Sequence, residues 1–237
     1  ALHMAEHYEA RVHAYNVSKA QVEWARREAA ERGLEDRVRF VMDDYRSIDE
    51  RCDRFVSVGM LEHVGPADYP SLGEVINRCL KPEGRGLVHS IGRVRPGPMN
   101  AWIERRIFPG AYPPSLKEMM DIFEPYRLSV LDVENLRLHY AKTLEHWLHR
   151  FEQHRDEIEA MMDQEFVRAY RLYLAGSIAA FKAGELDKDV VVVVRVGSWI
   201  VGRMTSTACD RRPTPAAEIG RAVQQECRDR YTISYAV

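Results

Sequence analysis

Residues 55–91, FVSVGMLEHVGPADYPSLGEVINRCLKPEGRGLVHSI, contain the pattern that decides the fold. A short apolar run at 55–58 is followed by an amphipathic stretch at 69–80, which stops at the turn sequence KPEG of 81–84. A second apolar run then covers 86–91. A strand, a helix and a strand in that order predict a βαβ unit, in which a helical crossover joins two parallel strands.

The same alternation continues on both sides of this unit. On the N-terminal side we expect the end of a helix at 1–8, a strand at 11–15, a helix at 20–32 and a strand at 38–42. On the C-terminal side we expect short helices at 102–108 and 116–123, a strand at 128–133, helices across 143–181 and a strand at 190–196. The pattern predicts an α/β fold of the Rossmann-like kind, with a parallel sheet covered on both faces and a helical cap from about 93 to 181.

Composition excludes several classes of protein. The chain has 237 residues, of which 46% are hydrophobic and 30% charged, and its net charge is −2, so it is globular and has no basic field for nucleic acid. The four cysteines, at positions 52, 79, 209 and 227, form no C-x-x-C pair, which fits a reducing compartment and predicts no metal site. The longest fully apolar run, 190–194, is too short to span a bilayer.

Polar side chains follow four successive predicted strands. Asn16 and Ser18 follow the first strand, and the sequence DDY at 43–45 follows the second. Glu62 comes after the third, and His89 ends the fourth. Because ligands of open parallel sheets bind at the carboxyl ends of the strands, these residues predict a nucleoside-like cofactor beside a reactive centre. The alternative is that these strands simply lead into polar loops.

Five short strings occur in a fixed order: GMLEHVG at 59–65, HSIG at 89–92, IFPGAYPPS at 107–115, EN at 134–135 and HYAKTL at 139–144. Together they resemble the cyclopropane-fatty-acyl-phospholipid synthase and mycolic acid cyclopropane synthase family. The resemblance runs from residue 1 to about 185. It implies a class I methyltransferase fold and S-adenosylmethionine (S-adenosyl-L-methionine) as the methyl donor.

The resemblance also assigns roles to individual residues. The segment at 16–21 stands where the family has T-L-S-x-x-Q beside the cofactor, and DY at 44–45 matches the pair next to the adenine. The implied cofactor-binding residues are therefore Asn16, Val17, Ser18, Lys19, Ala20, Gln21, Asp44 and Tyr45. The implied catalytic residues are Glu62, His89, Ile91 and Tyr140, which match positions that hold a bicarbonate ion, and Ser177, at a position that is often Cys.

Three of these residues also have purely structural interpretations. His89 could be a core histidine bonded to the backbone, Glu62 could cap the following helix, and Tyr140 could be a packing aromatic. The chemistry that the family resemblance implies would instead use these residues to hold a base. Attack of an alkene on a sulfonium methyl leaves a carbocation, and ring closure needs a well-placed base, for which a hydrogen-bonded bicarbonate could serve.

The predicted cap offers candidates for contact with an acyl chain. The residues expected to line an apolar tunnel are Met60, Trp102, Ile107, Phe108, Tyr112 and Tyr173, although most of them could be plain core. Four arginines near the expected entrance, at positions 93, 95, 105 and 106, could contact lipid phosphates or form a solvated charged face.

Two departures from the family pattern bear on activity. The family's glycine-rich cofactor loop, D-x-G-C-G-W-G, is expected immediately before Ala1, and without it the chain should bind cofactor poorly. From residue 187 no family counterpart is recognisable. We therefore expect a catalytic domain at 1–186, lacking the first strand and the glycine-rich loop, and a divergent tail at 187–237.

The expected function is methylene transfer to the cis double bond of an unsaturated fatty acyl chain of a phospholipid, which forms a cyclopropane ring. The enzyme would be cytoplasmic and would meet its lipid at the inner face of the membrane, and it could form a homodimer. Other reactions of the same family would instead give a methyl-branched or methylene-bearing acyl chain. An alternative hypothesis, supported by the missing glycine-rich loop, is that the chain is an inactive lipid-binding remnant. A small-molecule methyltransferase is disfavoured, because the sequence strings in the predicted cap are of the lipid-modifying type.

Overall fold

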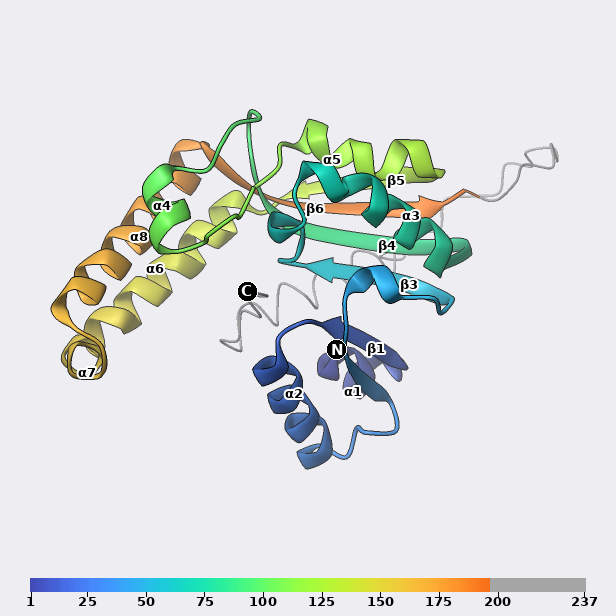
Figure 1. The fold of residues 1–237 in the computed structure, drawn as a ribbon, viewed down its shortest axis with the longest axis horizontal. Helices are drawn as coiled ribbons and strands as arrows, with labels where there is room; N and C mark the ends of the chain where they lie inside the picture. The colour runs from blue at the N-terminus through green and yellow to red at the C-terminus, as the bar shows by residue number, and fades with distance from the viewer. Residues whose placement is uncertain (197–237) are drawn as a thin grey trace, which may run out of the picture.

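The structure is a computed structural model, and it describes residues 1–196 (Figure 1). The α-helices are α1 (Leu2–Tyr8), α2 (Lys19–Glu31), α3 (Tyr69–Cys79), α4 (Ala101–Arg106), α5 (Leu116–Phe123), α6 (Arg137–Gln153), α7 (Arg155–Met161) and α8 (Gln164–Ala183). The strands are β1 (Val12–Asn16), β2 (Val38–Met42), β3 (Cys52–Val58), β4 (Leu80–Arg93), β5 (Leu128–Asn135) and β6 (Leu186–Arg195). Single 3-10 turns are η1 (Tyr45–Ser47), η2 (Leu61–His63), η3 (Pro66–Asp68) and η4 (Glu124–Tyr126).

The strands form two sheets, one of β1 and β2 and one in the order β3-β4-β6-β5. The pairs β1–β2 and β3–β4 are parallel, as the βαβ pattern predicts. The prediction of a wholly parallel sheet is wrong for β6, which runs antiparallel to both β4 and β5. The reason lies in the cap, because the chain leaves β5 into α6, returns along α8 and re-enters the sheet at the end where it left (Figure 1).

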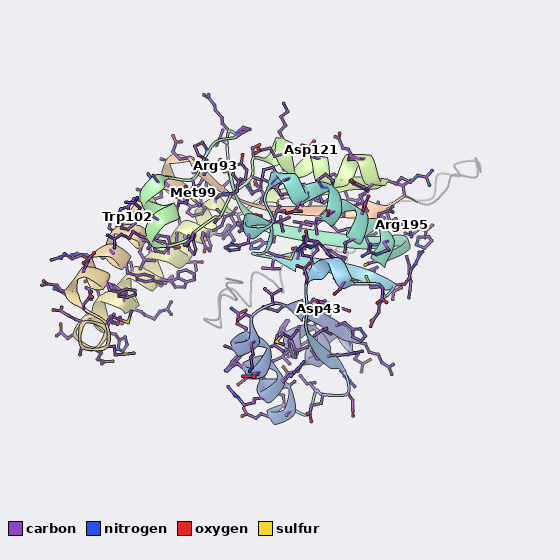
Figure 2. The ribbon with its side chains drawn as sticks, in the orientation of Figure 1. Asp43, Arg93, Met99, Trp102, Asp121 and Arg195 are labelled. Atoms are coloured by element: carbon purple, nitrogen blue, oxygen red, sulfur yellow. The ribbon has the colours of Figure 1, made fainter. Side chains whose placement is uncertain are left out.

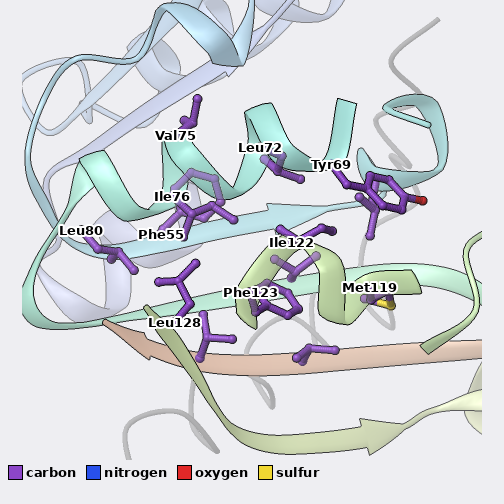
Figure 3. Close-up of a cluster of buried hydrophobic side chains, with 14 of the residues drawn as sticks. Phe55, Tyr69, Leu72, Val75, Ile76, Leu80, Met119, Ile122, Phe123 and Leu128 are labelled. Atoms are coloured by element: carbon purple, nitrogen blue, oxygen red, sulfur yellow. The ribbon is translucent and has the colours of Figure 1, made fainter. Parts of the chain in front are cut away.

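The main core lies between the four-stranded sheet and helices α3 and α5 (Figure 3). Helix α3 buries one stripe, with Tyr69, Leu72 and Ile76 against the sheet. Helix α5 begins with a capping box between Ser115 and Glu118 and buries Ile122 in the same core. This local signal explains why the bounds of α5 agree with the sequence prediction.

Helices α4, α6, α7 and α8 form the cap, which has its own aromatic core. Tyr170 lies 5.7 Å from the rings of Phe166 and Tyr173 and 5.2 Å from that of Phe151, so the aromatic stripe of 147–173 is largely helix packing. The predicted cap of 93–181 is too broad, because α5 and β5 belong to the sheet and its core. Helix α6 also begins at Arg137, six residues before the predicted 143.

Two further boundaries differ from the sequence prediction. The turn expected at 81–84 lies inside β4, where Glu83 takes a positive φ of 62° and the register against β3 shifts. Strand β6 continues to Arg195 between β4 and β5, so the sheet extends nine residues past the expected boundary at 186. The remainder of the predicted tail, 197–237, lies outside the described residues.

Candidate active site

A cavity of about 1980 Å³ opens where the carboxyl ends of β1, β3 and β4 face the cap. Its walls come from α1 and α2, from the strand ends, from the 93–103 segment and from the inner faces of α6 and α8. Figure 2 shows Arg93 and Met99 on the segment that joins β4 to the cap and Trp102 on α4 of the cap, whereas Asp43 lies on the part that contains β1 and β2. The cavity therefore lies where polar strand ends meet an apolar cap.

Glu62 and Ile91 join two strand ends in the wall of this cavity. The Glu62 carboxylate accepts a 2.6 Å hydrogen bond at Oε1 from the main-chain N–H of Ile91. The main-chain carbonyl of Glu62 accepts a second hydrogen bond, of 2.7 Å, from the main-chain N–H of Tyr112. Glu62 is 7% exposed, and its Oε2 atom is buried with no hydrogen-bond partner among the described residues. The helix-capping interpretation of Glu62 is therefore wrong, since its side chain binds β4 instead.

His89 lies on the same face of β4, two residues before Ile91. It is 2% exposed, and its Nδ1 atom has no hydrogen-bond partner in the part of the chain that the structure describes. Burial, followed by the positive charge of Lys188, lowers the pKa of His89 well below the ordinary value of 6.5. The imidazole is therefore neutral at pH 7 and offers a buried polar nitrogen without carrying charge.

Tyr140 enters the cavity wall from α6, opposite the strands. Its ring makes edge-on contacts with Phe181 at 5.0 Å and with Trp147 at 6.0 Å, so it is held by the aromatic core of the cap. It is 8% exposed. The packing and site interpretations of Tyr140 are thus both compatible with its position. Ser177, on α8, lines the same cavity.

Lys188 on β6 is a cavity residue that the sequence analysis did not identify. It is 8% exposed, and its Nζ atom lies 4.1 Å from the centre of the Tyr140 ring. In the β4–β6 register it stands opposite Ile91. The available signal was a lysine two residues before a run of five valines, within the segment that had been assigned to the tail.

The predicted cofactor segment is only partly in the cavity. Asn16 and Gln21 line it, and the Asn16 amide donates a 2.7 Å hydrogen bond to Gln21 Oε1. Asn16 Oδ1 accepts from the main-chain N–H of Ser18, also at 2.7 Å, which fixes the turn into α2. The cavity lining does not include Val17, Ser18, Lys19 or Ala20.

Asp44 and Tyr45 lie outside the cavity lining. Asp44 caps η1 and binds the Arg46 guanidinium at 2.9 and 2.8 Å, and these hydrogen bonds lower the pKa of its carboxyl group. Tyr45 is half-buried against the main core, and burial raises the pKa of its hydroxyl group. Neither side chain shares a wall with Asn16 in the described part of the chain, so their predicted adenine contact stays a prediction.

The acyl-chain candidates divide into two groups. Trp102, Phe108 and Tyr173 line the cavity. Met60 packs against the main core, Ile107 packs against the cap core, and the Tyr112 hydroxyl donates to Glu118 Oε1 at 2.7 Å, so none of these three is in the cavity lining.

The four arginines do not form one cluster. Arg93 and Arg95 line the cavity, and the Arg93 guanidinium donates to the carbonyls of Gly97 and Pro98 at 2.6 and 2.7 Å. Arg106 pairs with Glu165 of α8 at 3.3 Å. Residues 1–196 contain no group of three or more His, Cys, Asp or Glu side chains placed to hold a metal ion. None of the helices within that range is long and apolar enough to cross a bilayer.

The chain is similar to known proteins over most of its length. The chain matches the family model described as mycolic acid cyclopropane synthetase over residues 1–191. It is 34% identical over 199 residues to a probable fatty acid methyltransferase of Pseudomonas putida, which covers 81% of this chain and 50% of that relative. It is 34% identical over 196 residues to the cyclopropane-fatty-acyl-phospholipid synthase of Escherichia coli strain K12, covering 82% of this chain and 50% of the relative. The chain thus spans about half the length of these curated relatives.

Solved structures give the same result. The crystal structure of the mycolic acid cyclopropane synthase CmaA1 complexed with SAH and CTAB matches with a TM-score of 0.75 at 26% identity, covering 81% of this chain and 72% of that one. The likeness shows a class I methyltransferase fold with a mixed sheet. Because the family model spans residues 1–191, the chain belongs to the mycolic acid cyclopropane synthetase family of S-adenosylmethionine-dependent methyltransferases.

Proposed function

We propose that this protein transfers a methylene group from S-adenosylmethionine to the cis double bond of an unsaturated fatty acyl chain of a phospholipid, forming a cyclopropane ring. The observation that carries the proposal is the placement of Glu62, His89 and Tyr140 around one cavity with an apolar cap wall. Two relatives named for fatty-acyl chemistry support the substrate class.

The residues at the N-terminal wall fit a nucleoside cofactor in part. Asn16 and Gln21 present amide groups to the cavity at the carboxyl end of β1, and their mutual hydrogen bond holds both in place. When bound, S-adenosylmethionine would supply an electrophilic methyl group.

The buried polar groups fit a small hydrogen-bonding ion such as bicarbonate. Glu62 Oε2 can accept a hydrogen bond from a hydroxyl group, and His89 Nδ1 can donate one if that nitrogen carries the proton. Both atoms are buried without a partner among the described residues, which is costly unless a ligand satisfies them. Glu62, His89, Ile91 and Tyr140 would hold bicarbonate, which would supply a weak base at a fixed position.

The cap supplies orientation and excludes water. Trp102, Phe108 and Tyr173 give the cavity an apolar wall against which an acyl chain can lie. Edge-on packing of Phe108 against Tyr173, with ring centres 5.6 Å apart, keeps this wall rigid. A rigid, dry wall holds an alkene in one orientation and limits capture of a cationic centre by water.

The test is the fatty-acid profile of a bacterium that expresses this gene with and without the coding sequence upstream of Ala1. We expect an unsaturated acid to be replaced by a species one CH2 heavier that lacks an alkene, and Glu62→Gln to prevent the change. If no new lipid appears with the upstream segment restored, the enzymatic proposal fails and a non-catalytic lipid-binding role replaces it.

A methyl-branched product is the second candidate. It is favoured by the similarity to the probable fatty acid methyltransferase of Pseudomonas putida and to the tuberculostearic acid methyltransferase UfaA1 of Mycobacterium tuberculosis, which is 33% identical over 195 residues. In the same experiment, a branched chain in place of a ring would identify this outcome, and the proposed fate of the cation would be wrong.

The substrate class implies where the protein works. A phospholipid acyl chain must be drawn from a bilayer, so we propose peripheral contact with the inner face of the membrane by a cytoplasmic protein. Support comes from the cavity segment beside β4, where Val94 is 60% exposed next to Arg93 and Arg95. Co-sedimentation with anionic vesicles tests this proposal, and Arg95→Glu should reduce the bound fraction.

A further inference from the structure

Lys188 places an ammonium group in the wall that also holds the unpartnered atoms of Glu62 and His89. Residues that stand opposite each other in an antiparallel pair have side chains on the same face, so Lys188 shares a face with Ile91 and, two residues along β4, with His89. The neighbouring Asp189 points to the opposite face, where Asn135 Nδ2 donates to it at 2.9 Å. The contact of Lys188 with Tyr140 is therefore made on the cavity side.

Glu62, His89 and Arg93 can offer hydrogen bonds around this part of the cavity, but they supply no positive charge for an anion. Glu62 is a carboxyl group, and its Oε1 atom already occupies the Ile91 N–H. His89 is neutral at pH 7 because its pKa is lowered by burial and by the charge of Lys188. Arg93 lies two residues beyond Ile91, but its guanidinium is held by the carbonyls of Gly97 and Pro98. A small anion seated here would be repelled by Glu62 unless a nearby cation offset that repulsion.

We propose that Lys188 is the residue that gives this pocket its affinity for a small oxyanion, and that its contact with the Tyr140 ring positions the ammonium group for this role. The inference rests on the proposed function, in which such an oxyanion serves as the base beside the alkene. Lys188 would act as a positioning residue, since it holds the anion and takes no proton itself.

The charges in the cavity give a second reason to place an oxyanion beside Lys188. The proposed chemistry builds a positive centre in the cavity, and a lysine ammonium in the wall would repel that centre. An oxyanion beside Lys188 would offset this repulsion at short range. The alternative is a purely structural lysine, retained only for its contact with the Tyr140 ring.

Anion binding to the whole 237-residue chain distinguishes an oxyanion-binding role of Lys188 from a purely structural one. Binding of 13C-labelled bicarbonate is followed at pH 8 by NMR line broadening, and the melting temperature is followed over the same concentrations at constant ionic strength with chloride. We expect saturable binding that falls at least about tenfold in Lys188→Met and is largely kept in Lys188→Arg. Lys117→Met, which removes an exposed lysine of α5, should bind as the parent protein does.

Lys188→Met keeps an unbranched side chain of similar length, so it should still pack against the Tyr140 ring and fold. The response of its melting temperature to bicarbonate should be lost. If Lys188→Met were poorly folded by circular dichroism, Lys188→Gln would be measured in the same way. Unchanged bicarbonate affinity in the folded variant, or no saturable binding by the parent, overturns the inference.

The fate of the proposed function is decided separately by the lipid profile. Lys188-dependent bicarbonate binding without any new lipid would keep the anion site and reject the lipid reaction. A new lipid together with unchanged bicarbonate binding in Lys188→Met would keep the reaction and reject the role of Lys188.

Discussion

The Glu62 carboxylate and the main-chain N–H of Ile91 are joined by a hydrogen bond of 2.6 Å between the ends of β3 and β4. The bond uses one carboxylate oxygen to fix the side chain and leaves the other, Oε2, buried without a partner among the described residues. A group that is fixed by one atom and unsatisfied at the other is suited to bind a ligand at the second.

Glu62→Gln should abolish most activity while leaving the fold intact. The amide oxygen can still accept from Ile91, but the acceptor charge at the second position is lost, so we expect product formation to fall by about 100-fold or more. The melting temperature should change little. Gas chromatography of lipid extracts measures product formation, and calorimetry measures the melting temperature. Glu74→Gln, on the exposed side of α3, is the matched control. Wild-type product levels in Glu62→Gln would contradict the assignment.

His89 should make the folded state sensitive to mild acid. Its folded pKa is lowered below the ordinary 6.5, so below about pH 6.5 the unfolded chain binds a proton that the folded protein does not. The stability from this group is complete above pH 6.5 and is lost as the pH falls, by at most about 1.4 kcal/mol per pH unit. Urea titrations between pH 8 and pH 5 should show a shallower decline for His89→Gln than for the parent. The exposed His149→Gln should follow the parent, and equal slopes for all three would reject a neutral buried His89.

Local signals in the sequence predict most elements of this fold. The bounds of β2 and α5 agree with prediction, because each has a clear apolar pattern and α5 also begins with the Ser115–Glu118 capping box. The direction of β6 could not be predicted in this way. It depends on α6 and α8 carrying the chain out and back to one end of the sheet, and a run of valines is compatible with either direction.

The site was predictable to the extent that strand ends converge. Glu62 and His89 follow adjacent parallel strands, so their meeting follows from the βαβ pattern. Asp44 follows β2 but forms its ion pair locally with Arg46, because a guanidinium two residues away is within reach of a carboxylate in a 3-10 turn. Lys188 could not be predicted, since its neighbours Ile91 and Tyr140 lie 97 and 48 residues earlier in the chain and are brought to it by the antiparallel strand.

Gly73 lies where α3 packs tightly against α5, and we expect Gly73→Ala to be strongly destabilising. A Cβ atom there would overlap the carbonyl oxygen of Ile122 and the ring of Tyr126, so α3 and α5 would have to separate. The cost should be about 1–3 kcal/mol in urea unfolding. Gly176→Ala on α8 is the matched control, because no atom lies within 4 Å of the added carbon. That change should stabilise the helix by about 0.5–1 kcal/mol, and equal effects of the two substitutions would contradict the packing of α3 on α5.

Asp189 should be a source of instability at neutral pH, and Asp189→Asn should relieve it. Burial, with the nearby charge of Asp187, raises the pKa of Asp189 from 3.8 to about 6. A carboxyl group with a raised folded pKa favours the folded state while it is protonated, and that contribution is lost as the pH rises from about 4 through 6.

The asparagine keeps an oxygen to accept from Asn135 Nδ2 and never ionises, so at pH 7.5 we expect a gain of about 1–3 kcal/mol that disappears near pH 4. Urea unfolding at pH 7.5 and at pH 4 measures this gain in stability. Asp187→Asn gives the contrast, because Asp187 lies 3.8 Å from Arg137 and its removal takes away an ion pair. A gain from Asp189→Asn that is equally large at pH 4 would show that the effect does not come from ionisation of Asp189.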